Sequence, residues 1–303
     1  MAHDIVNEDD LQRVRMLCEN VLGDVYCNVE RLGGRTNHTY HVKLGNGREY
    51  AVRIPGEGTE ELIVREDERI STNLACDLDI DAKCLYFGQD GSKVTEYIPD
   101  AVTMSSALLK EDVRIIQMAE IFRRLHGCGQ DTGVPFEVFQ MAAGYEKIIS
   151  EKQVPMYTDY QKMKSEVMTI KAEIDKTCDI RKVPCHNDPL CENWVTEGKD
   201  GRMYLIDWEY AGMNDGMWDL ADVSIEAEYD KESDEKLLRE YLGRDIKKSD
   251  WKHFMANKIY VDFLWTLWAK TRVPYDGKPM EDWAIERYER LKYNVERYQK
   301  NRG

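Results

Sequence analysis

Strand-like segments crowd into the first hundred residues of this chain, whereas helical patterns fill most of the remainder. The strand-like segments alternate apolar and polar residues or are rich in Val, Ile and Tyr, and a G-N-G turn at 45–47 predicts a hairpin. They lie at 25–32, 38–44, 48–54, 83–88 and 93–98. This uneven distribution indicates a small sheet-rich part followed by a larger helical part.

Helical spacing of apolar residues predicts the other elements. The expected helices lie at 7–22, 59–76, 105–127, 139–151 and 158–177, with more beyond residue 215. Within the helical part, 192–197 and 203–208 read as a hairpin around a G-K-D-G turn. We therefore expect an α+β fold with two lobes, 1–98 and 99–303, and a ligand site in the cleft between them.

The composition excludes some classes of protein. A net charge of −15 argues against a nucleic-acid partner, because phosphate binding needs clustered Lys and Arg. It suits a small cation or carboxylates that hold metal ions. The N-terminus is acidic and shows no signal peptide, and the apolar stretch 260–270 is too short and charged to span a bilayer. We expect a cytoplasmic protein without membrane insertion, either a monomer or a homodimer.

The eight cysteines fall at irregular spacings without a C-x-x-C pair, which is typical of reduced core thiols rather than a disulfide framework. Cys185 and Cys191 flank His186, but neither the spacing nor a second cluster supports a zinc site.

Two acidic segments carry the chemistry. The first, P-C-H-N-D-P-L-C-E-N-W at 184–194, holds Asp188 and Asn193, and Asp207 ends the next strand-like run. If the hairpin pairs as expected, Asn193 and Asp207 meet at its mouth as a partial oxygen shell for Mg²⁺. Asp188 can then accept a hydrogen bond from an attacking hydroxyl. Protein kinases divide phosphoryl transfer in this way, with a catalytic Asp, a metal-binding Asn and a second metal-binding Asp. His186 is expected to shape the loop rather than transfer protons.

With these motifs the sequence resembles the choline/ethanolamine kinase family, within the aminoglycoside-phosphotransferase-like group of two-lobed, protein-kinase-like folds. The resemblance rests on H-N-D-P-L-C-E-N (186–193), L-I-D-W-E-Y-A-G (205–212) and D-L-A-D (219–222), and it extends into the N-terminal part at 32–42, 50–68 and 94–99. It implies Asp188 as catalytic base, Asn193 and Asp207 as Mg²⁺ ligands, and ATP as phosphate donor. The first lobe would bind the nucleotide, and the second would carry catalysis and substrate binding.

The resemblance also implies a nucleotide site. A phosphate loop is expected at 33–37, where glycine lets backbone N–H groups approach phosphates. Arg53 stands where protein kinases place a phosphate-pairing Lys, and Glu66 is expected as its ion-pair partner, with Glu68 or Glu61 as alternatives. The expected nucleotide-binding residues are Gly33, Gly34, Thr36, Asn37, Arg53, Glu66 and the hinge residues Glu96, Tyr97 and Ile98.

For the acceptor, Trp265 and Trp268 lie three apart on one helix, so both project from one face. A trimethylammonium group has no N–H and is best held by aromatic faces and nearby carboxylates. The expected substrate residues are Asp188, Glu209, Tyr210, Glu226, Tyr229, Trp265, Trp268, Trp283 and Tyr288. The resemblance thus favours an ATP- and Mg²⁺-dependent choline kinase. The alternatives are an ethanolamine kinase, an aminoglycoside or other small-molecule hydroxyl kinase, and a choline-binding pseudokinase.

Overall fold

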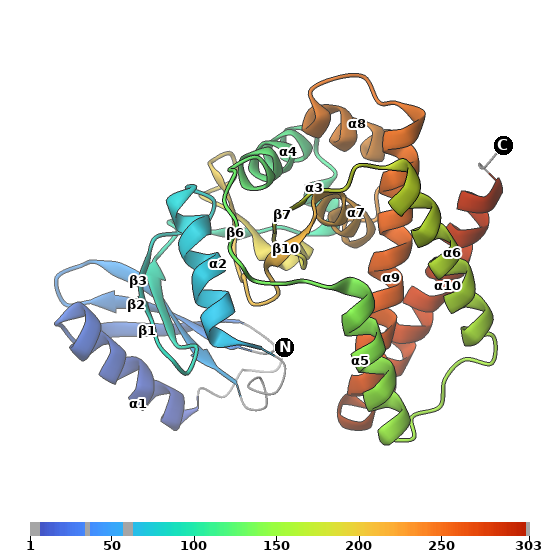
Figure 1. The fold of residues 1–303 in the computed structure, drawn as a ribbon. Helices are drawn as coiled ribbons and strands as arrows, with labels where there is room; N and C mark the ends of the chain where they lie inside the picture. Colours follow the sequence, from blue (N-terminus) through green and yellow to red (C-terminus); the bar gives the residue numbers. More distant parts are fainter. Residues whose placement is uncertain (1–6, 34–36, 57–62, 301–303) are drawn as a thin grey trace. The chain divides into compact units, whose positions relative to one another are not determined.

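The computed structural model describes residues 7–33, 37–56 and 63–300, and the chain forms two compact units (Figure 1). We call them the sheet unit, Met1–Met104 with Glu192–Ala211, and the helical unit, Ser105–Cys191 with Gly212–Gly303. The α+β prediction is confirmed. The expected boundary at 98/99 did not anticipate that segment 192–211 belongs with the sheet.

The sheet unit is built on a five-stranded antiparallel sheet. Its strands in spatial order are β1 (Tyr26–Gly33), β2 (Asn37–Leu44), β3 (Glu49–Pro55), β5 (Lys93–Glu96) and β4 (Cys84–Phe87). Alternate side chains of β2 and β3, such as Tyr40, Val42, Val52 and Ile54, are fully buried and form its core. All five strands match the segments expected from the sequence.

Two helices accompany this sheet. The first, α1 (Glu8–Leu17), continues through a π-helical turn, Cys18–Leu22, and it contributes Val14 and Cys18 to the core. Asn7 caps it, since its side chain accepts a hydrogen bond from the backbone N–H of Asp9 at 3.1 Å. The second, α2 (Arg65–Asp77), begins later than the predicted 59; residues 59–62 lie outside the described part.

A small second sheet completes the unit. The strand β8 (Trp194–Thr196) lies between β6 (Val102–Thr103) and β9 (Met203–Leu205), and all pairs are antiparallel. The expected hairpin at 192–208 is therefore confirmed. Its pairing with β6, which the sequence pattern did not show, explains why this hairpin belongs to the sheet unit.

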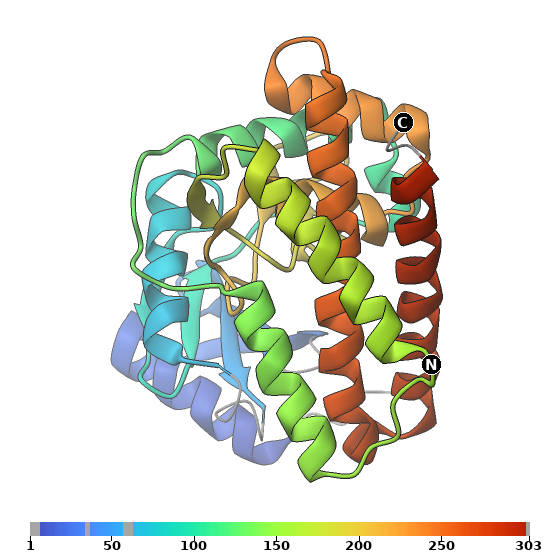
Figure 2. The ribbon, with the colours of Figure 1, turned by 45° about the vertical axis from the view of Figure 1, so that its right-hand side comes forward.

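The helical unit surrounds one long helix, α9 (Lys248–Asp276), against which α5, α6, α7 and α10 pack (Figure 2). The middle of α9 is buried on all sides, so it is the core of the unit. Its other helices are α3 (Ser106–Leu109), α4 (Asp112–His126), α5 (Val138–Glu151), α6 (Tyr160–Thr177), α7 (Gly216–Glu226), α8 (Lys231–Leu242) and α10 (Lys278–Lys300).

The helix expected over 105–127 is interrupted at Lys110–Glu111, which separates α3 from α4. An antiparallel pair of strands, β7 (Lys182–Cys185) and β10 (Gly212–Asp215), was not foreseen. This pair flanks the segment that carries Asp188. Among the described residues no helix is long and apolar enough to cross a membrane.

Candidate active site

The end of the β8–β9 hairpin brings Asn193 and Asp207 together. Trp194 is opposite Leu205 in the ladder, and the backbone N–H of Ile206 donates to the carbonyl oxygen of Asn193 at 2.9 Å. Asp207 follows directly, with a positive φ of 69° that turns the chain out of the strand. The prediction that these two residues meet at the hairpin mouth is confirmed.

This arrangement fits a magnesium ion. Carboxylate and amide oxygens are the protein ligands that Mg²⁺ takes, and it leaves its other positions to water and phosphate. The Asp207 side chain is 35% exposed, and Asn193 is also only partly buried, so neither is enclosed in the core. The donor set and its exposure therefore match the expected chemistry.

Arg53 on β3 lies beside Asp207, with its Nη1 3.3 Å from Oδ1 of the carboxylate. Its main partner is Glu68 on α2, at 2.5 Å from Nη1, and its Nη2 donates to the carbonyl oxygen of Gly91 at 2.8 Å. The expected partner, Glu66, is wrong: its carboxylate pairs with Arg69 on the surface. Glu68, the alternative, is the buried partner because it lies on the inner face of α2.

Glu209 adds a further carboxylate next to this pair. It accepts a hydrogen bond from Nδ2 of Asn37 at 2.9 Å, and Nη1 of Arg65 lies 3.8 Å from it. Burial, together with the charge of Asp207, raises the pKa of Glu209 to about 7. Glu209, expected as a substrate residue, lies among side chains of the sheet unit as a neighbour of Asp207, and its substrate role stays a prediction.

The expected phosphate loop is only partly described. Gly33 ends β1 and Asn37 begins β2, whereas Gly34 and Thr36 lie outside the described residues, as does Glu61. At the expected hinge, the N–H of Glu96 already donates to the carbonyl oxygen of Lys83 at 3.0 Å. Tyr97 stacks on His41 with ring centroids 3.8 Å apart. Of the three hinge residues, Glu96 therefore has its amide committed to the protein.

In the helical unit, the loop that carries Asp188 is fixed by Asp219 on α7. The two carboxylate oxygens of Asp219 accept the backbone N–H groups of His186 and Asn187, each at 2.8 Å. The ring of His186 then accepts the N–H of Asp188 at 3.3 Å. This bond agrees with the structural role expected for His186.

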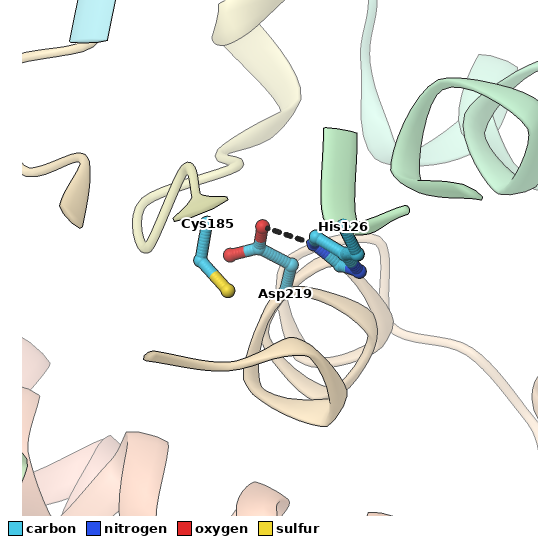
Figure 3. A group of neighbouring side chains, drawn as sticks. All are labelled: His126, Cys185 and Asp219. Carbon is cyan, nitrogen blue, oxygen red and sulfur yellow. Dashed lines mark hydrogen bonds and ion pairs between the residues drawn. The ribbon is translucent and has the colours of Figure 1, made fainter. Parts of the chain in front are cut away.

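Asp219 is itself held by His126 of α4, whose Nε2 lies 3.0 Å from Oδ2 (Figure 3). The hydroxyl of Tyr241 lies 2.9 Å from the other ring nitrogen of His126. A Cβ on Gly216 would come within 2.8 Å of this ring, so glycine is needed there for close packing. Through His126 and Asp219, helices α4 and α7 thus fix the loop in position.

Cys185 completes this cluster, since its ligand atom and those of His126 and Asp219 lie within 4.8 Å of one another (Figure 3). Burial raises the pKa of the Cys185 thiol well above its usual range, whereas zinc binds the thiolate. Both Asp219 oxygens already accept loop amides. The cluster is therefore a hydrogen-bonded anchor, and none of the eight cysteines, all of them within the described residues, forms a disulfide bond.

An open cavity of about 420 Å³ lies on the other side of His126 and includes Arg123, Asp215, Tyr241 and His253 in its wall. None of the expected substrate or nucleotide residues lines it. We do not assign it to the active site.

The expected substrate tryptophans form one continuous cluster in the helical unit. Trp265 and Trp268 of α9 meet edge to face with ring centroids 6.1 Å apart, and Trp268 meets Trp283 of α10 at 6.0 Å. Trp268 and Trp283 are partly exposed. The guanidinium of Arg287 covers one face of Trp283, 4.2 Å from the ring centroid. The three tryptophans therefore lie together, and an internal cation already covers part of their surface.

Acidic side chains of α7 and α9 line the same cluster. Glu226 accepts a hydrogen bond from Nη2 of Arg287, and Nε1 of Trp265 donates to Asp222 at 3.4 Å. Together Trp265, Trp268, Trp283, Asp222, Glu226, Asp262 and Arg287 form what we call the aromatic–acidic cluster.

Two further residues expected at the substrate, Tyr229 and Tyr288, make packing contacts within the helical unit. The hydroxyl of Tyr229 donates to the carbonyl oxygen of Leu109 at 2.6 Å, and Tyr229 is buried. Tyr288 stacks on Tyr157 with centroids 4.0 Å apart and donates to Asp159 at 2.8 Å. Tyr210, like Glu209, belongs to the sheet unit.

The sequence reasoning missed Asp219, His126 and Asp222, and it named Glu68 only as an alternative. Spacing offered a signal for two of them, because Asp219 and Asp222 lie seven and four residues before Glu226 and so share its helix face. His126 had no such signal, because its partners are distant in sequence.

The ion pair of Arg53 with Glu68, the hairpin that presents Asn193 and Asp207, and the anchored loop of Asp188 match the arrangement expected of a kinase-like phosphotransferase. Comparison with known proteins agrees: the choline/ethanolamine kinase family matches residues 29–269. The chain belongs to this family, whose members transfer phosphate to an alcohol group.

Individual relatives extend the match. The chain is 30% identical to Protein LicA of Haemophilus influenzae over 265 aligned residues. The aligned region covers 84% of this chain and 76% of LicA. It superposes on the crystal structure of choline kinase LicA from Streptococcus pneumoniae with a TM-score of 0.82 and 31% identity, over 96% of this chain and all of that one. A structure of LicA in complex with AMP gives a TM-score of 0.77 and 29% identity, over 95% and 98%. The two-lobed, kinase-like fold expected from the sequence is thereby confirmed.

Proposed function

We propose that the protein is a choline kinase that transfers the γ-phosphate of ATP to the hydroxyl of choline. The observation that carries this proposal is the aromatic–acidic cluster, in which three tryptophans lie together and one of them, Trp265, donates to the buried carboxylate of Asp222 on α7. Aromatic faces and carboxylates together recognise a quaternary ammonium group, which cannot donate hydrogen bonds. Similarity to LicA proteins, among them a choline kinase, supports the same acceptor.

In the proposed mechanism, Asp188 accepts the proton of the choline hydroxyl as that oxygen attacks the γ-phosphate. The bond between the γ-phosphorus and the bridging oxygen to the β-phosphate breaks, and ADP leaves. Asp219 fixes the backbone on which Asp188 is carried, through the amides of His186 and Asn187. This anchoring holds the carboxylate in position, and positioning supplies much of the catalysis in phosphoryl transfer.

The sheet unit would bind ATP and Mg²⁺. Asn193 and Asp207 are the residues that would hold the ion, which when bound neutralises charge on the transferred phosphates. Arg53, oriented by Glu68, places a permanent positive charge beside Asp207. The similarity to a LicA structure in complex with AMP supports an adenine nucleotide as donor.

Ethanolamine kinase is the second candidate. Its substrate presents N–H donors, which favour carboxylates over aromatic faces, and the same cluster offers Asp222 and Glu226. An aminoglycoside or other hydroxyl kinase, or a choline-binding pseudokinase, stays a more distant alternative.

An assay of ATP consumption against choline, ethanolamine and a panel of aminoglycosides tests the proposal. We expect the highest kcat/KM with choline. A higher value with ethanolamine or an aminoglycoside would replace the proposed acceptor. Choline binding without ATP consumption would instead indicate a pseudokinase.

A further inference from the structure

The carboxylate that sequence reasoning expected to meet the substrate's nitrogen, Glu226, already has a cationic partner. Arg287 donates to Glu226 through Nη2 and to Asp262 through Nη1, the latter at 3.3 Å. Arg290 also binds Asp262, at 2.8 Å from Nη2. Two of the three carboxylates in the aromatic–acidic cluster are thus paired with arginine.

The third carboxylate, Asp222, is different. It lies one helical turn before Glu226 on α7 and is 0% exposed. Its Oδ2 accepts the indole N–H of Trp265, whereas its Oδ1 has no hydrogen-bond partner among the described residues. A buried carboxylate oxygen without a partner is costly, so such atoms in native proteins call for an explanation.

The charges around Asp222 are mostly negative. Asp219 and Glu226 share its helix, and Asp188 contributes from the neighbouring loop; Arg287 of α10 is the cation that acts on it. Other charged groups of the elements packed on α7 are paired with one another: Asp262 with Arg290, Lys258 with Asp234, and His126 with Asp219. The site therefore has an excess of negative charge that an entering cation would offset.

We propose that Asp222 is the carboxylate that meets the cationic nitrogen of the substrate, beside the wall formed by Trp265 and Trp268. This proposal rests on the proposed function and names the residue that recognises charge within that site. Trp265 links the two parts, because its indole both binds Asp222 and meets Trp268 edge to face. Glu226 instead orients Arg287 over Trp283.

The environment of Asp222 gives the proposal a second consequence. Burial, followed by the charge of Glu226, raises the pKa of Asp222 well above its ordinary value. The raised pKa disfavours the ionised form in the absence of substrate, whereas an entering cation favours it, so that a proton held by the carboxyl group leaves to solvent. Choline binding should therefore release a proton and become tighter as the pH rises through this pKa.

The test compares two alcohols of the same shape. One is choline; the other is its neutral carbon analogue, in which a tert-butyl group replaces the trimethylammonium group. With Asp222→Asn we expect the KM for choline to rise about tenfold or more. The KM for the neutral alcohol and for ATP should stay within about twofold of wild type, because the side chain keeps its size.

Glu226→Gln is the matched control. This substitution removes the negative charge that pairs with Arg287, so we expect it to shift the KM of both alcohols by the same factor. If Asp222→Asn shifts both alcohols equally, or neither, Asp222 has only a structural role and the proposal fails. It also fails if Glu226→Gln alone selectively weakens choline.

A measurement on the wild-type protein is independent of these variants. Calorimetry of choline binding in two buffers of different ionisation enthalpy counts the protons released, and a value near zero at every pH would overturn the proposal. Failure of the proposed function is distinguishable from all these outcomes, since the wild-type protein would then consume no ATP with choline.

Discussion

The carboxylate of Glu68 and the guanidinium of Arg53 form a buried ion pair with a 2.5 Å contact between Oε1 and Nη1. Burial alone would raise the pKa of Glu68, but the charge and hydrogen bond of Arg53, together with Lys93 and Arg65, outweigh burial and hold the pKa below its usual value. The pair connects β3 to α2 and orients Arg53 toward Asp207.

Replacing Glu68 by Gln should therefore cost about 3–5 kcal/mol of unfolding free energy, because Arg53 would be left buried without its main counter-charge. The KM for ATP should rise as well. Glu66→Gln, two residues away on the exposed face, is the control and should change stability by less than about 0.5 kcal/mol. Denaturant unfolding and ATP titration measure both effects; equal effects of the two variants would contradict the assignment.

Asp207→Asn should raise the Mg²⁺ concentration needed for half-maximal activity about tenfold or more, because an amide oxygen replaces an anionic ligand. Asp200→Asn removes an exposed carboxylate from the turn of the same hairpin and should leave the Mg²⁺ dependence unchanged. A Mg²⁺ titration of initial rates reads out both variants. An unchanged midpoint for Asp207→Asn would remove Asp207 from the metal site.

Asp188→Ala should abolish turnover, with a loss of at least about 10²-fold in kcat, because the hydroxyl loses its proton acceptor. Choline binding, measured by calorimetry, should be largely intact. Asp179→Ala, at an exposed position before β7, is the control and should retain full activity. Retained turnover in Asp188→Ala would exclude Asp188 as the base.

Asp215 gives a prediction for the pH dependence of stability. Burial would raise its pKa, but the hydrogen bond from His253 and those from the Met217 amide and Asn257 outweigh burial, and the pKa lies below its ordinary value. The stabilisation is therefore complete above the unfolded-state pKa of about 3.9 and is lost as the pH falls through the folded-state value.

The difference in unfolding free energy between wild type and Asp215→Asn should accordingly be largest near neutral pH and shrink below about pH 4. Asn keeps the helix cap of α7, so the comparison isolates the charge. Urea unfolding at a series of pH values measures this difference. A difference that is constant from neutral to acidic pH would contradict the prediction.

The features that the sequence predicted well are local ones. The hairpin that joins Asn193 to Asp207 follows from short alternating runs around a turn, and strand pairing then fixes which residues meet. The strands of the first sheet were predictable for the same reason. The family motifs lie in these segments, so the catalytic and metal residues could be proposed without a structure.

The features that were missed depend on which face of a helix is buried. In α2 the buried positions are Glu68, Ser71, Thr72 and Ala75, which have helical spacing but little hydrophobicity. Because residues 66 and 68 lie about 200° apart around a helix, choosing between them requires knowing that face. Asp222 was overlooked in the same way, since its unpaired oxygen becomes evident only when the partners of Glu226 and Trp265 are known.

The sheet unit is made of two separate stretches of chain, because β8 and β9 join β6 only after the chain has passed through α3 to α6. A ribosome must therefore synthesise 211 residues before the first unit can be complete. A fragment that ends at Met104 would leave β6 without a partner strand and would lack Asp207. We expect the two units to depend on each other during synthesis, so that truncating or splitting the chain between 104 and 192 yields no independently folded nucleotide-binding domain.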